Sequence, residues 1–246
     1  FGYGTGSFSS VFKLETETSY DLNKHKTPHN NYLYILFELG FIGLIFFLSI
    51  FYFQIKELLN KDLNLDTLEN PKIFVNDKSV LEAILKFKIN KEEKNILLGI
   101  GGSGPTKRIP SKTFLELIRQ VSSIYPCKFF LATGKNKEEQ EILKEILNTE
   151  FKDKCVRLDN LGIYETLPII KNCDVSICND SSFSHLSSGL GVKTIVLMAD
   201  TPLLYGSYST LMFPVMPDGE STVSHDTLGK DKINPNKIFE QFKKIL

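Results

Sequence analysis

A long apolar stretch covers residues 32–53 near the start of the 246-residue chain. Its polar interruptions are Glu38 and Ser49, and Lys56 follows shortly after its end. As a helix rising 1.5 Å per residue, the stretch would span roughly 30 Å, the thickness of the hydrocarbon layer of a membrane. The pattern therefore predicts one transmembrane helix at about residues 32–53, within a membrane segment covering residues 1–56. A buried helix of a water-soluble protein is the alternative.

A polar stretch at residues 57–70 is predicted to be a linker, and the pattern changes after it. In residues 71–246, short apolar runs alternate with segments of helical periodicity. The predicted strands cover residues 95–100, 128–132, 155–158, 175–178 and 194–198. The predicted helices cover residues 79–87, opened by a capping box at Ser79 and Glu82, then 111–124, 137–147, 164–171, 183–189 and a last segment after Asn234–Pro235. This alternation predicts an α/β domain whose parallel sheet is covered by helices on both faces.

Loops rich in glycine, serine or charge follow four of the predicted strands, at residues 99–108, 133–138, 179–185 and 200–202. In an open parallel sheet, ligands bind in the crevice beyond the carboxyl ends of the strands. Because these ends lie at one edge of the sheet, we expect the four loops to meet there. The sequence therefore predicts a ligand site at this edge.

The glycine loop matches the dinucleotide-binding pattern at Gly99, Gly101 and Gly104, but Pro105 follows and no helix opens until about Ser111. The Gly-Lys-Ser/Thr ending of a phosphate-binding Walker loop is also absent from this loop. What remains is a turn whose backbone amides, together with the following lysine, are able to approach a phosphate. An ordinary tight turn is the alternative.

The segment from Asn179 to His185 is more informative. Asn179, Asp180 and Ser181 are all good N-cap residues, placed between an apolar strand and a short helix. A helix that opens there directs its free N–H groups into the crevice, which suits a diphosphate. His185 lies one turn into that helix and is expected to face the same ligand. Alternatively, Asp180 is only a cap and His185 only packs.

Composition excludes several classes of function. The 29 basic and 29 acidic residues balance, so nothing indicates a general affinity for nucleic acid. The four cysteines form no Cys-x-x-Cys pair, and no histidine lies at the spacing of a zinc site, so buried free thiols in a reducing compartment are expected. No acidic pair suits Mg²⁺, so no metal and no cofactor is predicted.

The loops together resemble glycosyltransferase family 9, the heptosyltransferases of lipopolysaccharide core synthesis, over about residues 71–217. The segment from Lys107 to Pro110 resembles the family's Lys-x-Trp-Pro, and the segment from Gly134 to Glu138 resembles its Gly-x-x-x-Glu. The segment from Asp180 to His185 resembles its Asp-Thr/Ser-Gly-x-x-His, with Ser182 in place of glycine. The resemblance implies a Rossmann-like domain, the C-terminal, donor-binding lobe of a GT-B fold.

This resemblance also implies roles for individual residues. Lys107 would contact the donor phosphate, Glu138 would hold the ribose, and Leu161 would flank the adenine. Lys107 and His185 would stabilise the leaving group. The complete set of implied donor contacts is Ser103, Thr106, Lys107, Glu138, Leu161, Asp180, Ser181, Ser182 and His185.

Residues 1–56 resemble a different family, the O-antigen ligases and polymerases of membranes. The resemblance rests on His29-Asn30 followed by Gly40 and Gly43. In that family the histidine lies on the periplasmic side just before a transmembrane helix and is thought to serve in glycan transfer, so His29 is a catalytic candidate under this analogy alone. The analogy would place the chain in a bacterial inner membrane with its C-terminal domain in the cytoplasm.

Together these features predict a membrane-anchored glycosyltransferase of lipopolysaccharide or cell-surface glycan synthesis. Its donor would be a nucleotide-diphospho-sugar, ADP-heptose, and its acceptor a lipid-linked glycan or lipopolysaccharide. Family 9 enzymes take their catalytic base from an N-terminal lobe that this sequence lacks, so a separate or missing lobe would complete the enzyme. The alternatives are a sugar-nucleotide-binding module without turnover on a membrane anchor, and a fragment of an O-antigen ligase or polymerase.

Overall fold

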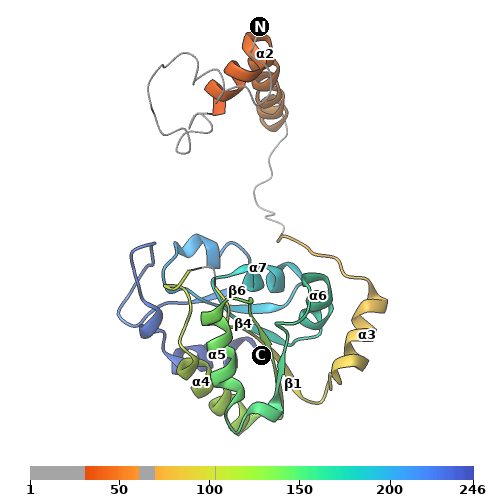
Figure 1. Cartoon of the computed structure of the whole chain (residues 1–246), viewed down its shortest axis with the longest axis vertical. Coiled ribbons are helices and arrows are strands. Elements are labelled where there is room, and N and C mark those ends of the chain that lie inside the picture. Colours follow the sequence, from red (N-terminus) through yellow and green to blue (C-terminus); the bar gives the residue numbers. More distant parts are fainter. Residues whose placement is uncertain (1–30, 61–69, 103) are drawn as a thin grey trace. The chain divides into compact units, whose positions relative to one another are not determined.

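The computed structural model describes residues 31–60, 70–102 and 104–246 (Figure 1). The chain divides into two compact units, Phe1–Leu68 and Glu69–Leu246. Two of the predicted site residues, His29 and Ser103, lie outside the described residues.

In the first unit, helix α2 (Asn31–Asn60) covers the stretch predicted to be one transmembrane helix. Its backbone leaves the helical conformation at Gly40, where φ is 71° and ψ is −174°. Residues with a Cβ rarely adopt such angles, so glycine at this position permits the break. The expectation of one continuous helix over residues 32–53 is therefore corrected to two helical segments. Within the part of the chain that the structure describes, no helix is long and apolar enough to cross a membrane.

The second unit is built on a six-stranded parallel sheet with the strand order β3-β2-β1-β4-β5-β6 (Figure 1). The strands are β1 (Lys94–Gly99), β2 (Cys127–Ala132), β3 (Cys155–Arg157), β4 (Val175–Asn179), β5 (Lys193–Leu197) and β6 (Met212–Val215). The helices are α3 (Asp77–Phe87), α4 (Ser111–Ile124), α5 (Lys137–Leu147), α6 (Ile163–Lys171), α7 (Ser182–Gly189) and α8 (Pro235–Ile245), with short 3₁₀ turns η1 (Lys152–Lys154), η2 (Leu203–Gly206) and η3 (Lys230–Lys232). The predicted α/β class and parallel sheet are confirmed.

Helices cover both faces of this sheet, because alternate strand residues point to opposite sides. Ile96 and Leu98 of β1 pack with residues of α4, α5 and α8 on one face. Leu97 between them packs with residues of α3, α6 and α7 on the other face. All three side chains are completely buried. The nearly continuous apolar runs of the strands follow from burial on both faces.

One local expectation was wrong, and one strand was not predicted. The structure begins α3 at Asp77, where the side chain of Asn76 accepts a hydrogen bond from the Lys78 amide, so the predicted capping box at Ser79 does not open this helix. Strand β6 was not predicted, because it is four residues long, lies at the sheet edge and contains Pro214. A proline interrupts the usual strand pattern and is tolerated at an edge.

The four cysteines are free thiols, as predicted. Cys127, Cys173 and Cys178 are buried, whereas Cys155 is partly exposed. Burial raises the pKa of both Cys155 and Cys178 to about 12, so these thiols stay protonated at neutral pH. Packing rather than reactivity therefore accounts for them.

Candidate functional site at the strand ends

A cavity lies where the winding of the sheet reverses. Strands β1 and β4 are neighbours, yet the chain leaves them toward β2 on one side and β5 on the other. Loops diverge at such a point and leave a crevice beyond the carboxyl ends of the strands. The cavity measures about 390 Å³ and is lined by Gly101, Gly102, Thr133, Gly134, Glu139, Ser181, Ser182 and Phe183. Three of the four predicted loops therefore contribute to one cavity.

Asn179, the last residue of β4, ties the loop after β1 to the sheet. Its side chain is completely buried. The Nδ2 group donates hydrogen bonds to the carbonyl oxygens of Ile100 at 2.9 Å and Gly101 at 3.2 Å. This one amide therefore fixes the path of the chain beside the cavity.

Glu139 of α5 joins the loops after β1 and β2. Its carboxylate accepts hydrogen bonds from the Gly102 amide at 3.1 Å, from the Gly134 amide and from the Thr133 hydroxyl at 3.1 Å. The residue is 5% exposed. One buried carboxylate therefore connects two walls of the cavity.

The environment of Glu139 favours its ionised form. Burial opposes ionisation, but hydrogen bonds from the Gly102 amide, Asn136, the Gly134 amide and Thr133 outweigh that effect. The pKa of Glu139 consequently lies below its ordinary value. Hydrogen bonds to the charged form lower a carboxyl pKa in this way.

The glycines of these loops make room for that carboxylate. A Cβ added to Gly134 would lie 2.5 Å from Oε2 of Glu139, and one added to Gly101 would lie 2.9 Å from the same atom. By contrast, a Cβ on Gly104 would have no heavy atom closer than 3.8 Å. The sequence interpretation attributed the glycines of the loop after β1 to the approach of a phosphate, and Gly134 entered only through the family resemblance. Packing against Glu139 is the reason that the structure provides at Gly101 and Gly134.

Glu138, the predicted ribose contact, does not line the cavity. Its side chain is 66% exposed and forms an ion pair with Arg108. The Arg108 side chain is 11% exposed and its Nε donates to the Gly102 carbonyl at 2.9 Å. Sequence reasoning missed the neighbouring Glu139, although Asn136 caps α5 and Glu139 occupies the third helical position, the pattern of a residue that reaches back toward the preceding loop.

Lys107 and Asp180, predicted from two different motifs, are brought together. The Nζ of Lys107 lies 3.0 Å from Oδ2 of Asp180. The carboxylate side chain is 5% exposed and the lysine side chain 23% exposed. The pair therefore links the loop after β1 to the end of β4, and its cationic member remains accessible to solvent.

Helix α7 begins at the cavity. Ser181 is its N-cap residue, and Ser181 makes no side-chain capping bond. Ser181 Oγ and Asn179 Oδ1 are buried and have no hydrogen-bond partner among the described residues. Ser182, the first helical residue, is exposed and lines the cavity. The helix thus presents free N–H groups and polar side chains where an anion would fit.

His185 has a partner that the sequence did not indicate. Its Nδ1 lies 2.8 Å from the hydroxyl of Tyr208, which belongs to the loop between β5 and β6. The two rings stack with their centroids 5.6 Å apart and an interplanar angle of 16°. A separation of 23 residues leaves no local sequence pattern that could have identified this contact.

Of the predicted donor contacts that the structure describes, Ser181 and Ser182 line the cavity, whereas Thr106, Lys107, Glu138, Leu161, Asp180 and His185 do not. Leu161 packs against the core on the α3, α6 and α7 face. Thr106 is partly exposed within the loop after β1. Neither position tests the role that the resemblance implies for it.

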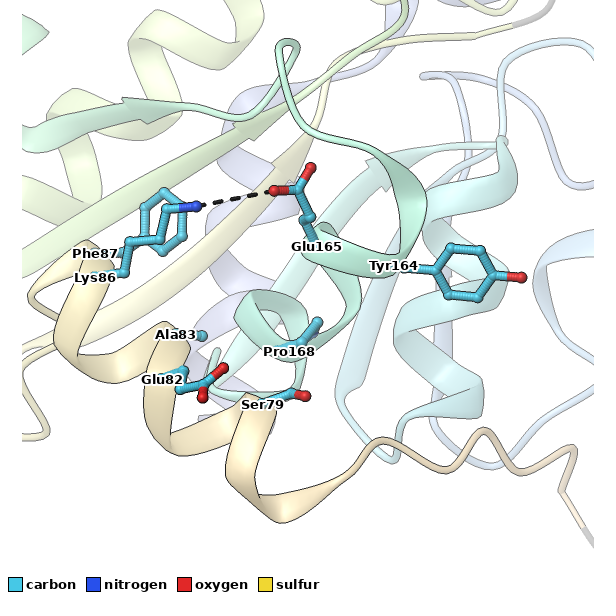
Figure 2. Close-up of a pocket in the computed structure, with 8 residues that line it drawn as sticks. All are labelled: Ser79, Glu82, Ala83, Lys86, Phe87, Tyr164, Glu165 and Pro168. Carbon is cyan, nitrogen blue, oxygen red and sulfur yellow. Dashed lines mark ion pairs between the residues drawn. The ribbon is translucent and has the colours of Figure 1, made fainter.

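A second cavity, of about 230 Å³, lies between α3 and α6 (Figure 2). Lys86 and Glu165 face each other across it, with 3.9 Å between Nζ and Oε1. Both side chains are more than half exposed. None of the predicted site residues that the structure describes lines this cavity. The cavity at the strand ends is therefore the candidate functional site.

Known proteins match this chain in sequence. The family described as glycosyltransferase family 9 (heptosyltransferase) matches residues 54–212. Lipopolysaccharide heptosyltransferase 1 of Campylobacter coli and lipooligosaccharide heptosyltransferase 2 of Campylobacter jejuni are each 26% identical to it. These matches cover 82% and 96% of this chain, but 57% and 70% of the two relatives.

Solved structures share the fold. The ADP-heptose lipopolysaccharide heptosyltransferase II of E. coli aligns with a TM-score of 0.58 at 20% identity, over 73% of this chain and 54% of that chain. A family 9 glycosyltransferase of Veillonella parvula aligns with a TM-score of 0.58 at 16% identity, over 73% and 55%. The chain thus spans about half the length of these structures.

Proposed function

The chain belongs to glycosyltransferase family 9, and from this premise we propose that residues 71–246 bind the nucleotide-diphospho-sugar donor of a lipopolysaccharide heptosyltransferase, with ADP-heptose as that donor. The observation that carries the proposal is the meeting of Lys107, Asp180 and the start of α7 beside one cavity. A lysine and the free amides of a helix start are suited to a diphosphate.

The diphosphate would lie against the first turn of α7, with Ser181 and Ser182 beside it. Lys107 would exchange its contact with Asp180 for one with a phosphate oxygen, since its side chain is partly exposed and long enough to turn. Asp180 would then hold the lysine near the site before the ligand arrives. The exposed Glu138, held by Arg108, would contact the ribose at the rim.

In the proposed reaction an acceptor hydroxyl attacks the anomeric carbon of the donor, and the nucleoside diphosphate leaves. Lys107 and the α7 amides stabilise the charge that develops on the departing phosphate. His185 donates to the same group, with Tyr208 fixing its ring. These residues all serve the donor, so we propose that the base for the acceptor comes from a second lobe, upstream or in a partner.

A transfer assay tests this function. Purified chain would be given radiolabelled ADP-heptose and a lipid A–inner core acceptor, alone and with the N-terminal lobe of a family 9 enzyme. We expect ADP binding by the chain alone and transfer only with the added lobe, because general-base help typically contributes 10²- to 10⁴-fold. Absence of ADP binding contradicts the donor role. Rapid transfer by the chain alone contradicts the need for a second lobe and makes His185 the first residue to replace.

Although no described helix is long and apolar enough to cross a membrane, we further propose that the apolar part of α2 anchors the protein at the bacterial inner membrane, with the second unit in the cytoplasm. Phe41, Phe46 and Phe53 are 67%, 69% and 64% exposed, and between residues 41 and 53 large apolar side chains dominate, with Ser49 as the polar interruption. A helix that is apolar all round is covered by lipid or by other protein. Release of the full chain by carbonate without detergent would contradict the anchor. Protection of the second unit from cytoplasmic protease would reverse the orientation.

The resemblance of residues 1–56 to O-antigen ligases and polymerases stays a prediction, since His29 lies outside the described residues. A binding module without turnover also stays open. Tight ADP binding combined with no transfer, even when the second lobe is supplied, would favour that module.

A further inference from the structure

Glu139 occupies an unusual position for a carboxylate beside a site for an anion. It lines the cavity, yet it is 5% exposed and its two oxygens accept bonds from Gly102, Gly134 and Thr133. A carboxylate with free oxygens would repel a ligand phosphate bound in the same cavity. These hydrogen bonds engage both carboxylate oxygens with protein groups, so Glu139 is not expected to contact the ligand.

We propose that Glu139 is a positioning residue of the donor site, whose ionised carboxylate holds the loops after β1 and β2 together in the form that binds the nucleotide. The proposal rests on the proposed donor-binding function. It names a residue that acts through the shape of the cavity. It also explains why Gly101 and Gly134 are glycines without invoking a ligand.

Charge and hydrogen bonding explain why a carboxylate is required here. Two backbone N–H groups and one hydroxyl converge on the Glu139 side chain, and they come from both loops. The Nε of Arg108 lies 3.7 Å from Oε1 and adds a positive charge on the same side. An amide in place of the carboxylate would present one acceptor oxygen and an NH₂ group that faces donors. The two loops would then lose part of their connection.

Steric fit gives independent support. The three heavy atoms nearest to a Cβ added to Gly134, apart from its chain neighbours, all belong to the Glu139 carboxyl group, the nearest at 2.5 Å. The φ angle of Gly134 is not positive, so no backbone strain calls for glycine at this position. The absence of a side chain at Gly134 is therefore explained by the presence of Glu139.

The first experiment measures ADP binding by calorimetry with the full chain in detergent. We expect Glu139→Gln to weaken ADP binding by about tenfold or more, the change that corresponds to loss of a charge-assisted hydrogen bond. The matched control is Glu141→Gln, two residues further along α5 on its exposed side, which should leave ADP binding unchanged. Circular dichroism confirms that each variant is folded. Equal ADP affinity of folded Glu139→Gln and wild type would overturn the proposal.

The second experiment is a double-mutant cycle of Gly134→Ala and Glu139→Ala, measured by ADP affinity and by urea unfolding. If Gly134 is small because of Glu139, Gly134→Ala is harmful in the wild type and nearly neutral in the Glu139→Ala background. The two changes therefore couple strongly. Gly101→Ala is the contrast, because its added Cβ would also lie 3.2 Å from the Thr133 backbone and should harm both backgrounds. Simple additivity of Gly134→Ala and Glu139→Ala would overturn the steric argument.

A third measurement separates this proposal from the proposed function. In the ligand-free protein, the amide protons of Gly102 and Gly134 should shift in NMR spectra on Glu139→Gln, because they lose a charged acceptor. If the wild type does not bind ADP while both shifts are seen, the donor function fails and the loop connection stands. If neither amide responds, the connection itself is wrong.

Discussion

The two sides of the cavity differ in how their polar groups are satisfied. On the α5 side, the Glu139 carboxylate is buried and accepts bonds from three protein donors. On the α7 side, Ser181 Oγ lacks a partner within the described part of the chain, and Lys107 is 23% exposed beside Asp180. A saturated network has no capacity left for a ligand, whereas incomplete bonding leaves groups that a ligand can satisfy. Under the proposed function, the α5 side is thus a framework, and the α7 side is the surface that would bind the ligand.

This difference separates effects on folding from effects on binding. Changes in the framework should lower both the free energy of unfolding and ligand affinity, because the loops lose their positions. Changes on the binding side should lower affinity with a smaller effect on folding. Asn179 stands at the boundary, since Nδ2 belongs to the framework and Oδ1 has no partner among the described residues.

The largest expected effect is that of Asn179→Asp. The new carboxylate would face the carbonyl oxygens of Ile100 and Gly101 in a site without solvent exposure. Neither bond could form, and a buried charge would lack a donor, so the free energy of unfolding should fall by at least about 3 kcal/mol at pH 7. Urea unfolding measures this change. The matched control, Asn160→Asp at an exposed loop position, should stay within about 0.5 kcal/mol of wild type.

Acid should reduce the penalty of Asn179→Asp, because protonation restores one donor toward a carbonyl. A loss of stability below 1 kcal/mol at neutral pH would mean that water or movement of the loop replaces the amide. Asn179 would then not belong to the framework.

The next effect is on binding. Lys107→Ala should weaken ADP binding by about 1.5–3 kcal/mol, the range for a hydrogen bond to a charged group. AMP, which lacks the second phosphate, should lose less. The exposed Lys112→Ala serves as the control for a general loss of positive charge near the site. Calorimetry that gives equal ADP affinities for wild type and Lys107→Ala would remove Lys107 from the binding surface.

A third prediction concerns the acid side of the stability curve. The folded-state pKa of Glu139 is lowered from 4.5, so its ionisation stabilises the folded protein fully above that pH. The contribution is lost as the pH falls through the lower folded pKa. Wild type should therefore lose more stability than Glu139→Gln on acidification below pH 4.5, by up to about 1.4 kcal/mol per pH unit for one proton. The exposed Glu138 is common to both proteins and cancels in the comparison. Parallel curves in urea titrations from pH 5 to pH 2.5 would contradict a lowered pKa.

The fold class and the meeting of three predicted loops at one cavity were readable in the sequence, for a physical reason. Alternating strands and helices permit few arrangements, and parallel strands place their following loops at one edge. Lys107 and Asp180 could therefore be expected at the same edge although 73 residues separate them. Strand β6 was not predicted because its four residues contain a proline and owe their conformation to pairing with β5.

Side-chain partners could not be predicted in the same way. Glu138 and Glu139 are adjacent and chemically identical, and the rotation of α5 alone determines which of them enters the core. That rotation is set by the burial of Leu143 and Ile146, which Glu139 precedes by four and seven positions. The spacing of Glu139 from Leu143 and Ile146 was present in the sequence, but the resemblance to family 9 pointed to Glu138. The contact between His185 and Tyr208 depends on the path of a loop and left no local pattern.

The smallest expected effect is that of Tyr208→Phe on the binding side. The variant keeps the ring that stacks on His185 and removes the hydroxyl that lies 2.8 Å from Nδ1. Burial raises the pKa of Tyr208, so the hydroxyl is protonated at neutral pH and able to donate to this nitrogen. Loss of one partly exposed hydrogen bond should change the free energy of unfolding by less than about 1 kcal/mol, because water replaces the partner.

The informative measurement on Tyr208→Phe is the nitrogen NMR spectrum of His185. Nδ1 should shift more than Nε2, since the hydroxyl contacts Nδ1 and sets which nitrogen carries the proton. ADP affinity should fall by about threefold, less than for Lys107→Ala, because the ring keeps its place. Tyr205→Phe, at a half-exposed tyrosine three residues away, is the matched control and should leave the His185 signals unchanged. If Tyr208→Phe also left those signals unchanged, the tyrosine would only pack against the ring, and His185 would be oriented by α7 alone.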